Sequence, residues 1–256
     1  VLEEDIEQLD EVVVIGYGTV RKSDLTGAVS TVKSEELVKI PSNNPMQALQ
    51  GKVAGVQVNS ISGAPGENVV VRVRGTGTFN NASPIYVVDG VILNDISFLN
   101  AADIQSMEVL KDASATAIYG SRGANGVIMV TTKQGQLGQG TTFTYNGEYS
   151  IQQVANKIDL LNGREFATIY NEIIPGTFNN IDALPNTDWQ DLIFQTAALH
   201  NHQVSATGAS DRTQYYVGIG YYNQEGIIDK SRYERLSIKL NNTYHLSDAI
   251  KLGNNI

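Results

Sequence analysis

Apolar and polar positions follow two different patterns along the chain. Up to about residue 135, short β-branched runs are separated by glycine, proline, asparagine and aspartate. Runs of this kind, bounded by turn-forming residues, predict buried strands in a small domain that also contains short helices. We expect strands at 29–32, 56–59, 69–75, 85–88, 91–93, 104–110 and 127–132.

Three short helices are predicted between these strands. Ser34 precedes two glutamates, which is typical of a capped helix start with an acidic first turn. Pro45 suits the first turn of a helix that ends before Gly51. Asp112 can cap a further turn that reaches residue 117, and three glycines are expected to break it: Gly120, Gly123 and Gly126.

Beyond a glycine-rich break at 135–140, the pattern becomes a regular alternation with a period of two. Residues 141–151, 215–221 and 234–246 each place apolar side chains on one face and polar ones on the other, and a fainter strand covers 199–207. Such strands fit a soluble sandwich that buries its apolar face, or a transmembrane β-barrel that turns this face towards lipid. Nine of the twelve tyrosines follow residue 140, as the aromatic girdles of a barrel require.

The lengths of the links between these strands also discriminate. The link at 208–212 is short, whereas 152–198 and 224–232 are longer, and the first of these is expected to contain a helix from Arg164 to Ile174. If the first strand runs outward from the periplasm, the long links lie outside and the short one inside. This alternation is typical of bacterial barrels.

Composition and charge exclude several classes of protein. The net charge is −9, from 18 basic and 27 acidic residues, and no basic stripe of the kind that binds nucleic acid is present. Cysteine is absent, which excludes disulfides and thiolate chemistry. No apolar run reaches the roughly 18 residues that a membrane-spanning helix needs. Both ends of the sequence read as interrupted, so we expect an N-terminal fragment of a larger protein.

No constellation for catalysis or for a cofactor stands out, and we expect no enzyme. The pair Gly16 and Gly18 lacks the third glycine of a dinucleotide site. His200 and His202 share one face of a predicted strand, without a third metal ligand. Four oxygen-bearing side chains invite a Ca²⁺ site, but their spacing is not that of an EF-hand and suits turns and caps instead: Asp89, Asn94, Asp95 and Asp103.

The stretch 10–18 has an acidic start, four β-branched residues and a glycine end. It fits an ordinary buried strand, and it equally fits a peptide that adds to the sheet of a partner protein through main-chain hydrogen bonds. The pattern alone leaves both readings open.

Three stretches, in order, carry a resemblance to a known family. NPMQALQGKVAGVQV, PIYVVDGV and IQSMEVLKD followed by AIYGSRGANGVIMVTTK resemble the plug domain of TonB-dependent outer-membrane transporters, and in particular the SusC/RagA branch. The resemblance covers residues 10–135. It implies a preceding segment with the TonB box at 1–18, an α+β plug domain at 19–135 with a small mixed sheet and short helices, and the first antiparallel strands of a transmembrane β-barrel at 136–256.

The resemblance also implies roles for individual residues. The energy-coupling protein TonB would bind the TonB box from the periplasm. This segment corresponds here to Glu11, Val12, Val13, Val14 and Ile15. Three arginines would form ion pairs between plug and barrel: Arg72, Arg74 and Arg122. An apical plug loop would place three residues against the substrate: Phe79, Asn80 and Asn81.

As a function, the resemblance implies TonB-dependent import of a glycan or peptide oligomer across the Gram-negative outer membrane. The plug would sit inside the barrel with a periplasmic N-terminus, and a SusD-like surface lipoprotein would cover the barrel. Partners would thus be TonB with its energising complex, the lipoprotein, the oligomer and outer-membrane lipid, but no nucleic acid. Two alternatives stay open, a siderophore or cobalamin receptor of the same fold and a soluble β-rich binding or adhesion module.

Overall fold

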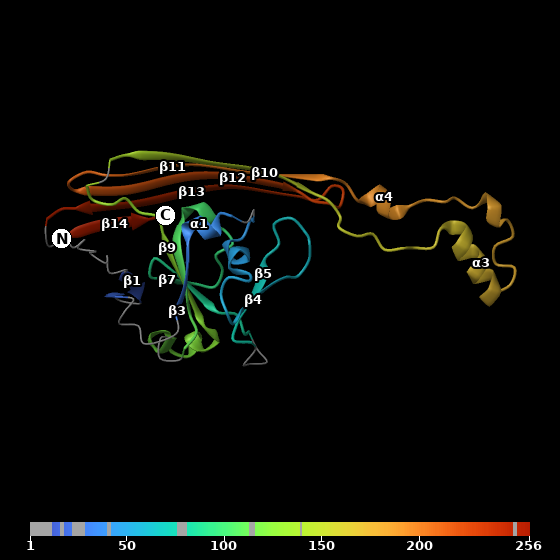
Figure 1. The fold of residues 1–256 in the computed structure, drawn as a ribbon, viewed down its shortest axis with the longest axis horizontal. Coiled ribbons are helices and arrows are strands. Elements are labelled where there is room, and N and C mark those ends of the chain that lie inside the picture. Colours follow the sequence, from blue (N-terminus) through green and yellow to red (C-terminus); the bar gives the residue numbers. More distant parts are fainter. Residues whose placement is uncertain are drawn as a thin grey trace, which may run out of the picture.

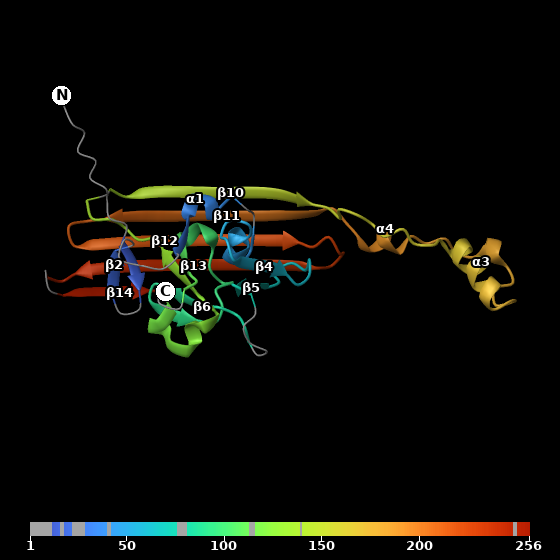
Figure 2. The same ribbon diagram turned by 60° about the horizontal axis from the view of Figure 1, so that its bottom comes forward.

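The structure is a computed structural model that describes most of the chain. The described residues are 12–15, 18–21, 29–39, 42–75, 81–112, 116–138, 140–247 and 250–256. Residues 29–138 form an N-terminal unit, and residues 142–255 form a long antiparallel sheet that lies along one side of this unit (Figures 1 and 2). A separate two-stranded hairpin, β1 (Val12–Ile15) and β2 (Gly18–Arg21), belongs to neither sheet.

A five-stranded mixed sheet organises the N-terminal unit, with the order β3-β8-β9-β6-β7. Only β6 and β9 pair in parallel, and the remaining neighbours are antiparallel. A second, two-stranded sheet packs beside it. The strands are β3 (Val29–Lys33), β4 (Val56–Ser60), β5 (Val69–Val73), β6 (Ile85–Val88), β7 (Val91–Leu93), β8 (Ile104–Leu110) and β9 (Val127–Thr132).

Within the described part of this unit, four short helical segments connect the strands: α1 (Ser34–Leu37), η2 (Pro45–Leu49), η3 (Ala101–Asp103) and η4 (Ala117–Asn125). Pro45 opens η2 as expected, and the Asn44 side chain caps it. Ser34 does not cap α1, because it is the first helical residue, and the side chain of Lys33 at the cap position makes no capping hydrogen bond.

The glycine-rich stretch after residue 117 is more helical than predicted. Gly123 lies inside η4 and does not break it, whereas Gly120 kinks the helix with a φ of 60° and Gly126 ends it with a φ of 93°. A Cβ at Gly126 would also lie 2.8 Å from the Cβ of Val73. Only a glycine therefore allows the chain to enter β9 at this point.

Among the described residues, the two clusters of buried apolar side chains lie in the N-terminal unit. Both clusters of buried apolar side chains are built from residues between 32 and 130, and Met107, Val109 and Ile128 are fully buried at their centre. The long sheet contributes to neither cluster. The apolar side chains of each cluster therefore pack on one another within the unit, while Leu199 and Tyr216 of the sheet are buried outside these clusters.

The long sheet is a simple meander with the order β10-β11-β12-β13-β14. Its strands are β10 (Thr142–Gln152), β11 (Ala197–Ala209), β12 (Thr213–Glu225), β13 (Arg232–His245) and β14 (Lys251–Asn255). All four pairings are antiparallel, with continuous registers. The predicted strands are all present, and β11 and β12 extend several residues beyond the predicted limits.

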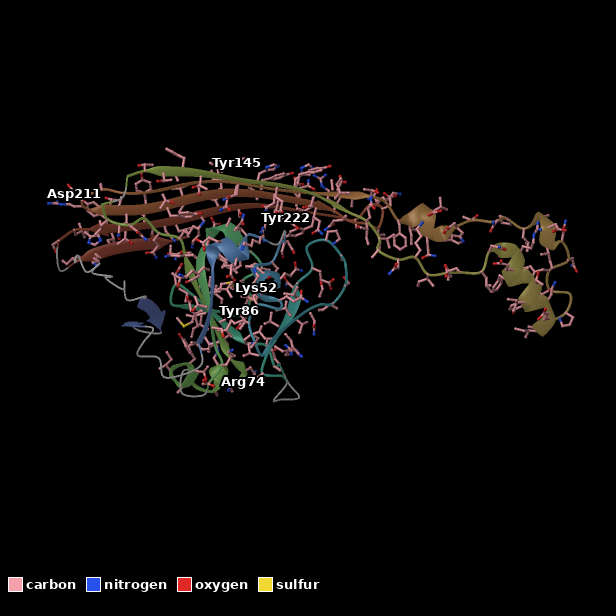
Figure 3. All side chains as sticks on the ribbon, in the orientation of Figure 1. Lys52, Arg74, Tyr86, Tyr145, Asp211 and Tyr222 are labelled. Atoms are coloured by element: carbon pink, nitrogen blue, oxygen red, sulfur yellow. The ribbon has the colours of Figure 1, made fainter. Side chains whose placement is uncertain are left out.

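The long sheet exposes its apolar face and buries its polar face, which is the reverse of a sheet in a soluble protein. On β13, Leu236 and Ile238 are 69% and 60% exposed, whereas Lys239 and Asn241 on the other face are 7% and 5% exposed. Figure 3 shows the same division, with Tyr145 on the side away from the N-terminal unit and Tyr222 on the side towards it. The polar face packs on the unit, and the apolar face is exposed.

The segment 153–196 projects beyond the ends of the strands (Figures 1 and 2). It contains α3 (Gly163–Ile173), η5 (Ile181–Ala183) and α4 (Trp189–Ile193). The predicted helix is α3, which begins at a capping box formed by Asn162 and Glu165. The other links of the sheet are much shorter, and the shortest lies at 210–212. None of the described helices is both long and apolar enough to cross a membrane.

Candidate functional site at the seam between unit and sheet

The polar face of the long sheet meets the N-terminal unit along a contact that we call the seam. Its centre is the carboxylate of Asp103, which is 3% exposed. Asp103 Oδ1 accepts a hydrogen bond from the Tyr216 hydroxyl at 2.6 Å and another from the Gln203 side-chain amide. Both donors come from the sheet, so one buried acceptor on the unit joins two neighbouring strands, β11 and β12.

Local structure positions this carboxylate. The Asn100 side chain accepts from the backbone of Ala102 at 3.1 Å and so caps the short turn that Asp103 ends. The backbone carbonyl of Asp103 accepts a hydrogen bond from the backbone amide of Lys133 at 2.8 Å. Opposite lies Gly218, where a Cβ would come within 2.5 Å of Asp103 Oδ1. The close approach of unit and sheet therefore requires a residue without a side chain on β12.

Further hydrogen bonds extend the seam in both directions. Asn241 Nδ2 donates to Thr132 Oγ1 at 2.7 Å and to the carbonyl of Lys133 at 2.9 Å. The Arg235 guanidinium donates to the backbone carbonyl of Asn43 at 2.7 Å and to that of Ser97. Strands β11, β12 and β13 thus each send at least one polar side chain to the unit.

At the far edge, Asp89 links the unit to β14. It accepts from the backbone amide of Thr132 at 2.9 Å and from its hydroxyl at 2.5 Å, and Asn255 also donates to it. Asp89 and Gly90 both have positive φ angles, 47° and 88°, as the predicted two-residue turn between β6 and β7 requires. The turn thereby aims a carboxylate at the last strand of the sheet.

The composition of the seam has a mechanical consequence. A hydrogen bond between neutral groups adds about 0.5–1.5 kcal/mol and one to a charged group, such as those of Asp103, Asp89 and Arg235, about 1.5–3 kcal/mol, because water replaces the protein partner when the bond opens. The apolar core of the unit is not shared with the sheet. Separation of the unit from the sheet would therefore break these hydrogen bonds but divide neither apolar cluster.

Burial changes the titration of two groups on the unit side of the seam. Desolvation raises the pKa of the Asp103 carboxyl, while the hydrogen bond from Tyr216 and the nearby charge of Lys133 oppose this rise. Desolvation also lowers the pKa of the Lys133 ammonium, and the Asp103 charge opposes that change. In both cases burial disfavours the charged form.

These shifts predict how stability depends on pH. Because the folded-state pKa of Asp103 is raised, its contribution to stability is complete below the ordinary pKa of 3.8 and is lost as the pH rises through the folded value. Asp103→Asn keeps an oxygen acceptor and removes the buried charge. We expect this variant to be more stable than the natural protein near pH 7, with a difference that vanishes below about pH 4.

Asp103→Ala provides the matched comparison. It leaves the hydroxyl of Tyr216 and the amide of Gln203 without their acceptor, so it should destabilise at every pH, by roughly 1–3 kcal/mol. Urea unfolding of the full-length protein, followed between pH 3 and pH 8, measures both variants. A pH-independent difference between the natural protein and Asp103→Asn would contradict the assignment.

The three predicted arginines have their described contacts within the N-terminal unit. Arg74 forms an ion pair with Asp112, Arg72 donates to Ser83 Oγ at 3.2 Å, and Arg122 donates to Asn94 Oδ1 at 3.4 Å. Figure 3 shows Arg74 at the end of the unit that is remote from the long sheet. Ion pairing of these arginines with barrel carboxylates stays a prediction.

The other predicted binding residues are described only in part. Phe79 and Asn80 lie outside the described residues, and so does Glu11. Asn81 accepts from the backbone of Ser83 at 2.9 Å and its carbonyl accepts from Asn125, so its side chain is part of a turn. The rest of the predicted TonB box, Val12–Ile15, is strand β1. Roles in binding remain predictions for all of them.

The two histidines lie on the exposed face of β11. Tyr145 shares a hydrogen bond of 2.9 Å with His202 Nδ1, and Tyr149 makes an edge contact with His200 at 4.8 Å. Asp89, Asp95 and Asp103 each bind different partners. Within the described part of the chain, no group of three or more metal-binding side chains is brought together.

Local sequence contains no signal for the hydrogen-bonded centre of the seam. The spacing of Asp103 suggests only a metal ligand or a cap, and the pattern predicts no particular role for Gln203 or Tyr216. The alternation of β12 did place Gly218 and Gly220 opposite its apolar face, and that face proves to be the exposed one. Small residues on the polar face were therefore the one available sign of a close contact.

Comparisons with known proteins agree with this architecture. Residues 21–127 match the family model "TonB-dependent Receptor Plug Domain". TonB-dependent receptor P3 of Formosa agariphila is 49% identical over the whole chain, and TonB-dependent receptor SusC of Bacteroides thetaiotaomicron is 42% identical over 94% of it. A solved structure of the RagAB peptide importer in an open-open state superposes on 96% of the chain with a TM-score of 0.81 and 33% identity.

The fold and the seam thus define a plug domain packed against antiparallel strands. The chain belongs to the SusC/RagA-like TonB-dependent receptors. It spans about a quarter of the length of both curated relatives and 31% of the RagAB chain. From here on, the N-terminal unit is called the plug and the long sheet is called the wall.

Proposed function

We propose that the chain forms the plug and the first wall strands of a TonB-dependent nutrient importer in the Gram-negative outer membrane. The inverted wall is the observation that carries this proposal. Its apolar face is exposed and its polar face contacts the plug, as in barrels that face lipid outside and a polar lumen inside. A soluble sandwich would bury the apolar face instead.

Strand length supports the same proposal. Strands β10 to β13 contain 11, 13, 13 and 14 residues. A tilted strand needs about 9–11 residues to cross the hydrocarbon layer. The sheet order places β10 and β14 at the two edges, and an edge in lipid leaves backbone groups unsatisfied. We infer that further strands pair with these edges and close the barrel, with domain limits at 1–18, 19–135 and 136–256.

In this proposal the plug blocks the lumen until TonB displaces it. The segment Glu11–Ile15 is the handle, because its described part, Val12–Ile15, forms a hairpin outside both sheets and is open to pairing on one edge. Force on this handle would act on a plug that is held by a polar seam. Such a contact opens at modest cost, which suits a movable element.

The proposed partners follow from the relatives. Likeness to SusC and to RagAB supports a SusD-like lipoprotein on the outer surface and a glycan or peptide oligomer as cargo. Arg72, Arg74 and Arg122 remain candidates for plug–barrel ion pairs, and Phe79, Asn80 and Asn81 for substrate contact. The segment 153–196 would project on the extracellular side, and the link 210–212 would face the periplasm.

Growth of a deletion strain tests the proposal. The strain and a complemented strain are grown on defined glycans or peptides as sole nutrient. We expect loss of growth on one oligomer class, restoration by the full-length gene, and loss of uptake when a protonophore collapses the inner-membrane gradient. Co-purification of a surface lipoprotein should accompany restoration. Uptake that continues without the gradient would overturn the proposed function.

A further inference from the structure

A pocket opens in the seam at the end of the wall from which the segment 153–196 leaves. Its volume is about 490 Å³, within the roughly 300–1,000 Å³ of ligand pockets. The plug contributes residues 42–47 and the loop 60–67, and the wall contributes the ends of β10 and β12. The pocket is therefore built jointly by two parts that the proposed mechanism separates.

The wall side of the pocket is a chain of neutral hydrogen bonds. Tyr222 Oη donates to Gln224 Oε1 at 3.1 Å, and Gln224 Nε2 donates to Gln152 Oε1 at 3.1 Å. The Arg235 guanidinium lies over the Tyr222 ring, 5.8 Å from its centre. The result is an aromatic ring with a hydroxyl, flanked by amides.

The plug side is equally polar. Ser60 donates to the carbonyl of Ser62 at 3.0 Å, and Ser62 in turn donates to the Glu67 carboxylate. The Gln47 side chain accepts from Ser42, and Asn43 is 7% exposed. Within the described residues, the side-chain nitrogens of Gln47 and Gln152 have no acceptor. They are donors available to a ligand.

The charge of the lining narrows the class of ligand. Among the described residues that line the pocket there is neither lysine nor arginine, and Glu67 is the one carboxylate. An anionic ligand would lose its hydration without gaining a cation as partner. The amides and hydroxyls of the lining instead match a ligand that carries many hydroxyl groups and no charge, whereas the Tyr222 side chain is 2% exposed and offers little contact surface.

We propose that this pocket is a binding subsite for an uncharged, hydroxyl-rich unit, namely one or two neutral sugar residues of the transported oligomer. The inference rests on the proposed import function and names the ligand class for it. Because plug and wall both line the pocket, displacement of the plug dismantles it. By linkage, a bound sugar favours the seated plug, and energised displacement of the plug releases the sugar into the lumen.

A matched pair of variants on β12 tests the subsite. Gln224→Leu removes a lining amide, whereas Gln214→Leu makes the same change on the same face at the other end of the strand. Both side chains are half-buried. Calorimetry on full-length receptor in detergent uses neutral trisaccharides of several linkages, one uronic-acid trisaccharide and trialanine. We expect a neutral trisaccharide to bind, about tenfold more weakly in Gln224→Leu and within twofold of natural affinity in Gln214→Leu.

Hydrogen exchange provides a second measurement. Protection that depends on the added trisaccharide would not be expected if Gln224 had only a structural role. The bound trisaccharide should slow amide exchange in residues 60–67 of the natural protein and much less in Gln224→Leu. If Gln224→Leu fails to fold, Ser62→Ala on the plug side replaces it, with the same expected loss of affinity.

Three results would overturn the inference: unchanged affinity in Gln224→Leu, tighter binding of trialanine or the uronic acid than of any neutral trisaccharide, or no binding of any neutral trisaccharide. Failure of the proposed function is recognised separately. Import that does not require the proton gradient would overturn the function and leave the binding result intact.

Discussion

Replacing Val13 and Val14 by proline is expected to abolish energised uptake and to leave outer-membrane insertion unchanged. Both residues lie in β1, where they face Val20 and Thr19 of β2. Proline removes the backbone donors that a pairing strand needs, whether that strand is β2 or one from TonB. The change lies outside the plug core and the wall, so folding of both should proceed. Uptake of the identified oligomer and the amount of receptor in outer-membrane fractions are measured together.

Val20→Pro separates the two partners of β1. It disrupts the hairpin from the β2 side and leaves the backbone donors of Val12–Ile15 intact. If TonB grips β1, this variant should retain most uptake, whereas the double variant retains none. Equal loss in both variants would show that the hairpin itself is required. Unchanged uptake in the double proline variant would contradict the assignment of this segment as the TonB box.

Gly218→Val is expected to unseat the plug. The nearest atom to a Cβ at this position is Asp103 Oδ1 at 2.5 Å, with the Tyr216 ring at 3.1 Å, so the side chain enters the centre of the seam. Forcing extra atoms into a packed contact costs about 1–3 kcal/mol, which is comparable to the hydrogen bonds at Asp103 that it disrupts. We expect a leaky lumen, measured as higher sensitivity to large hydrophilic antibiotics that the outer membrane normally excludes.

Val217→Leu is the matched control, because it adds volume at the neighbouring position on the opposite face of β12. That face is directed away from the plug, so antibiotic sensitivity should stay at the natural level. Receptor abundance in the outer membrane is measured for both variants. Natural sensitivity in Gly218→Val at equal abundance would contradict a seam that seals the lumen.

Two features explain why most of the secondary structure followed from the sequence. The strict alternation of β10 and β13 marks strands on its own, since a strand has a period of two. Turn residues then fixed their ends, as with Asp89 and Gly90. The 3₁₀ helix from Ala117 to Asn125 is not predicted by the pattern, because isolated glycines suggest breaks. Of the three glycines in this stretch, Gly120 and Gly126 adopt positive φ and Gly123 does not.

Among the candidate sites, local signals and tertiary contacts differed in what they revealed. The four β-branched residues of β1 were recognisable because an edge strand is defined by its own composition. The Asp103 hub was not, because its partners Gln203 and Tyr216 are 100 and 113 residues away along the chain. A carboxylate next to a turn reads as a cap until the surrounding fold shows what it accepts from.

The sequence alone determined the two kinds of strand and the existence of a polar and an apolar face on each wall strand, because these follow from local periodicity. It also determined the family resemblance, through three ordered motifs. Only the tertiary structure decided which of the two faces is buried. Periodicity cannot distinguish inside from outside, since the same alternation serves a soluble sandwich and a wall that faces lipid. The polar face is the buried one because Asp103, Thr132 and the backbone of Asn43 on the plug accept hydrogen bonds from its side chains.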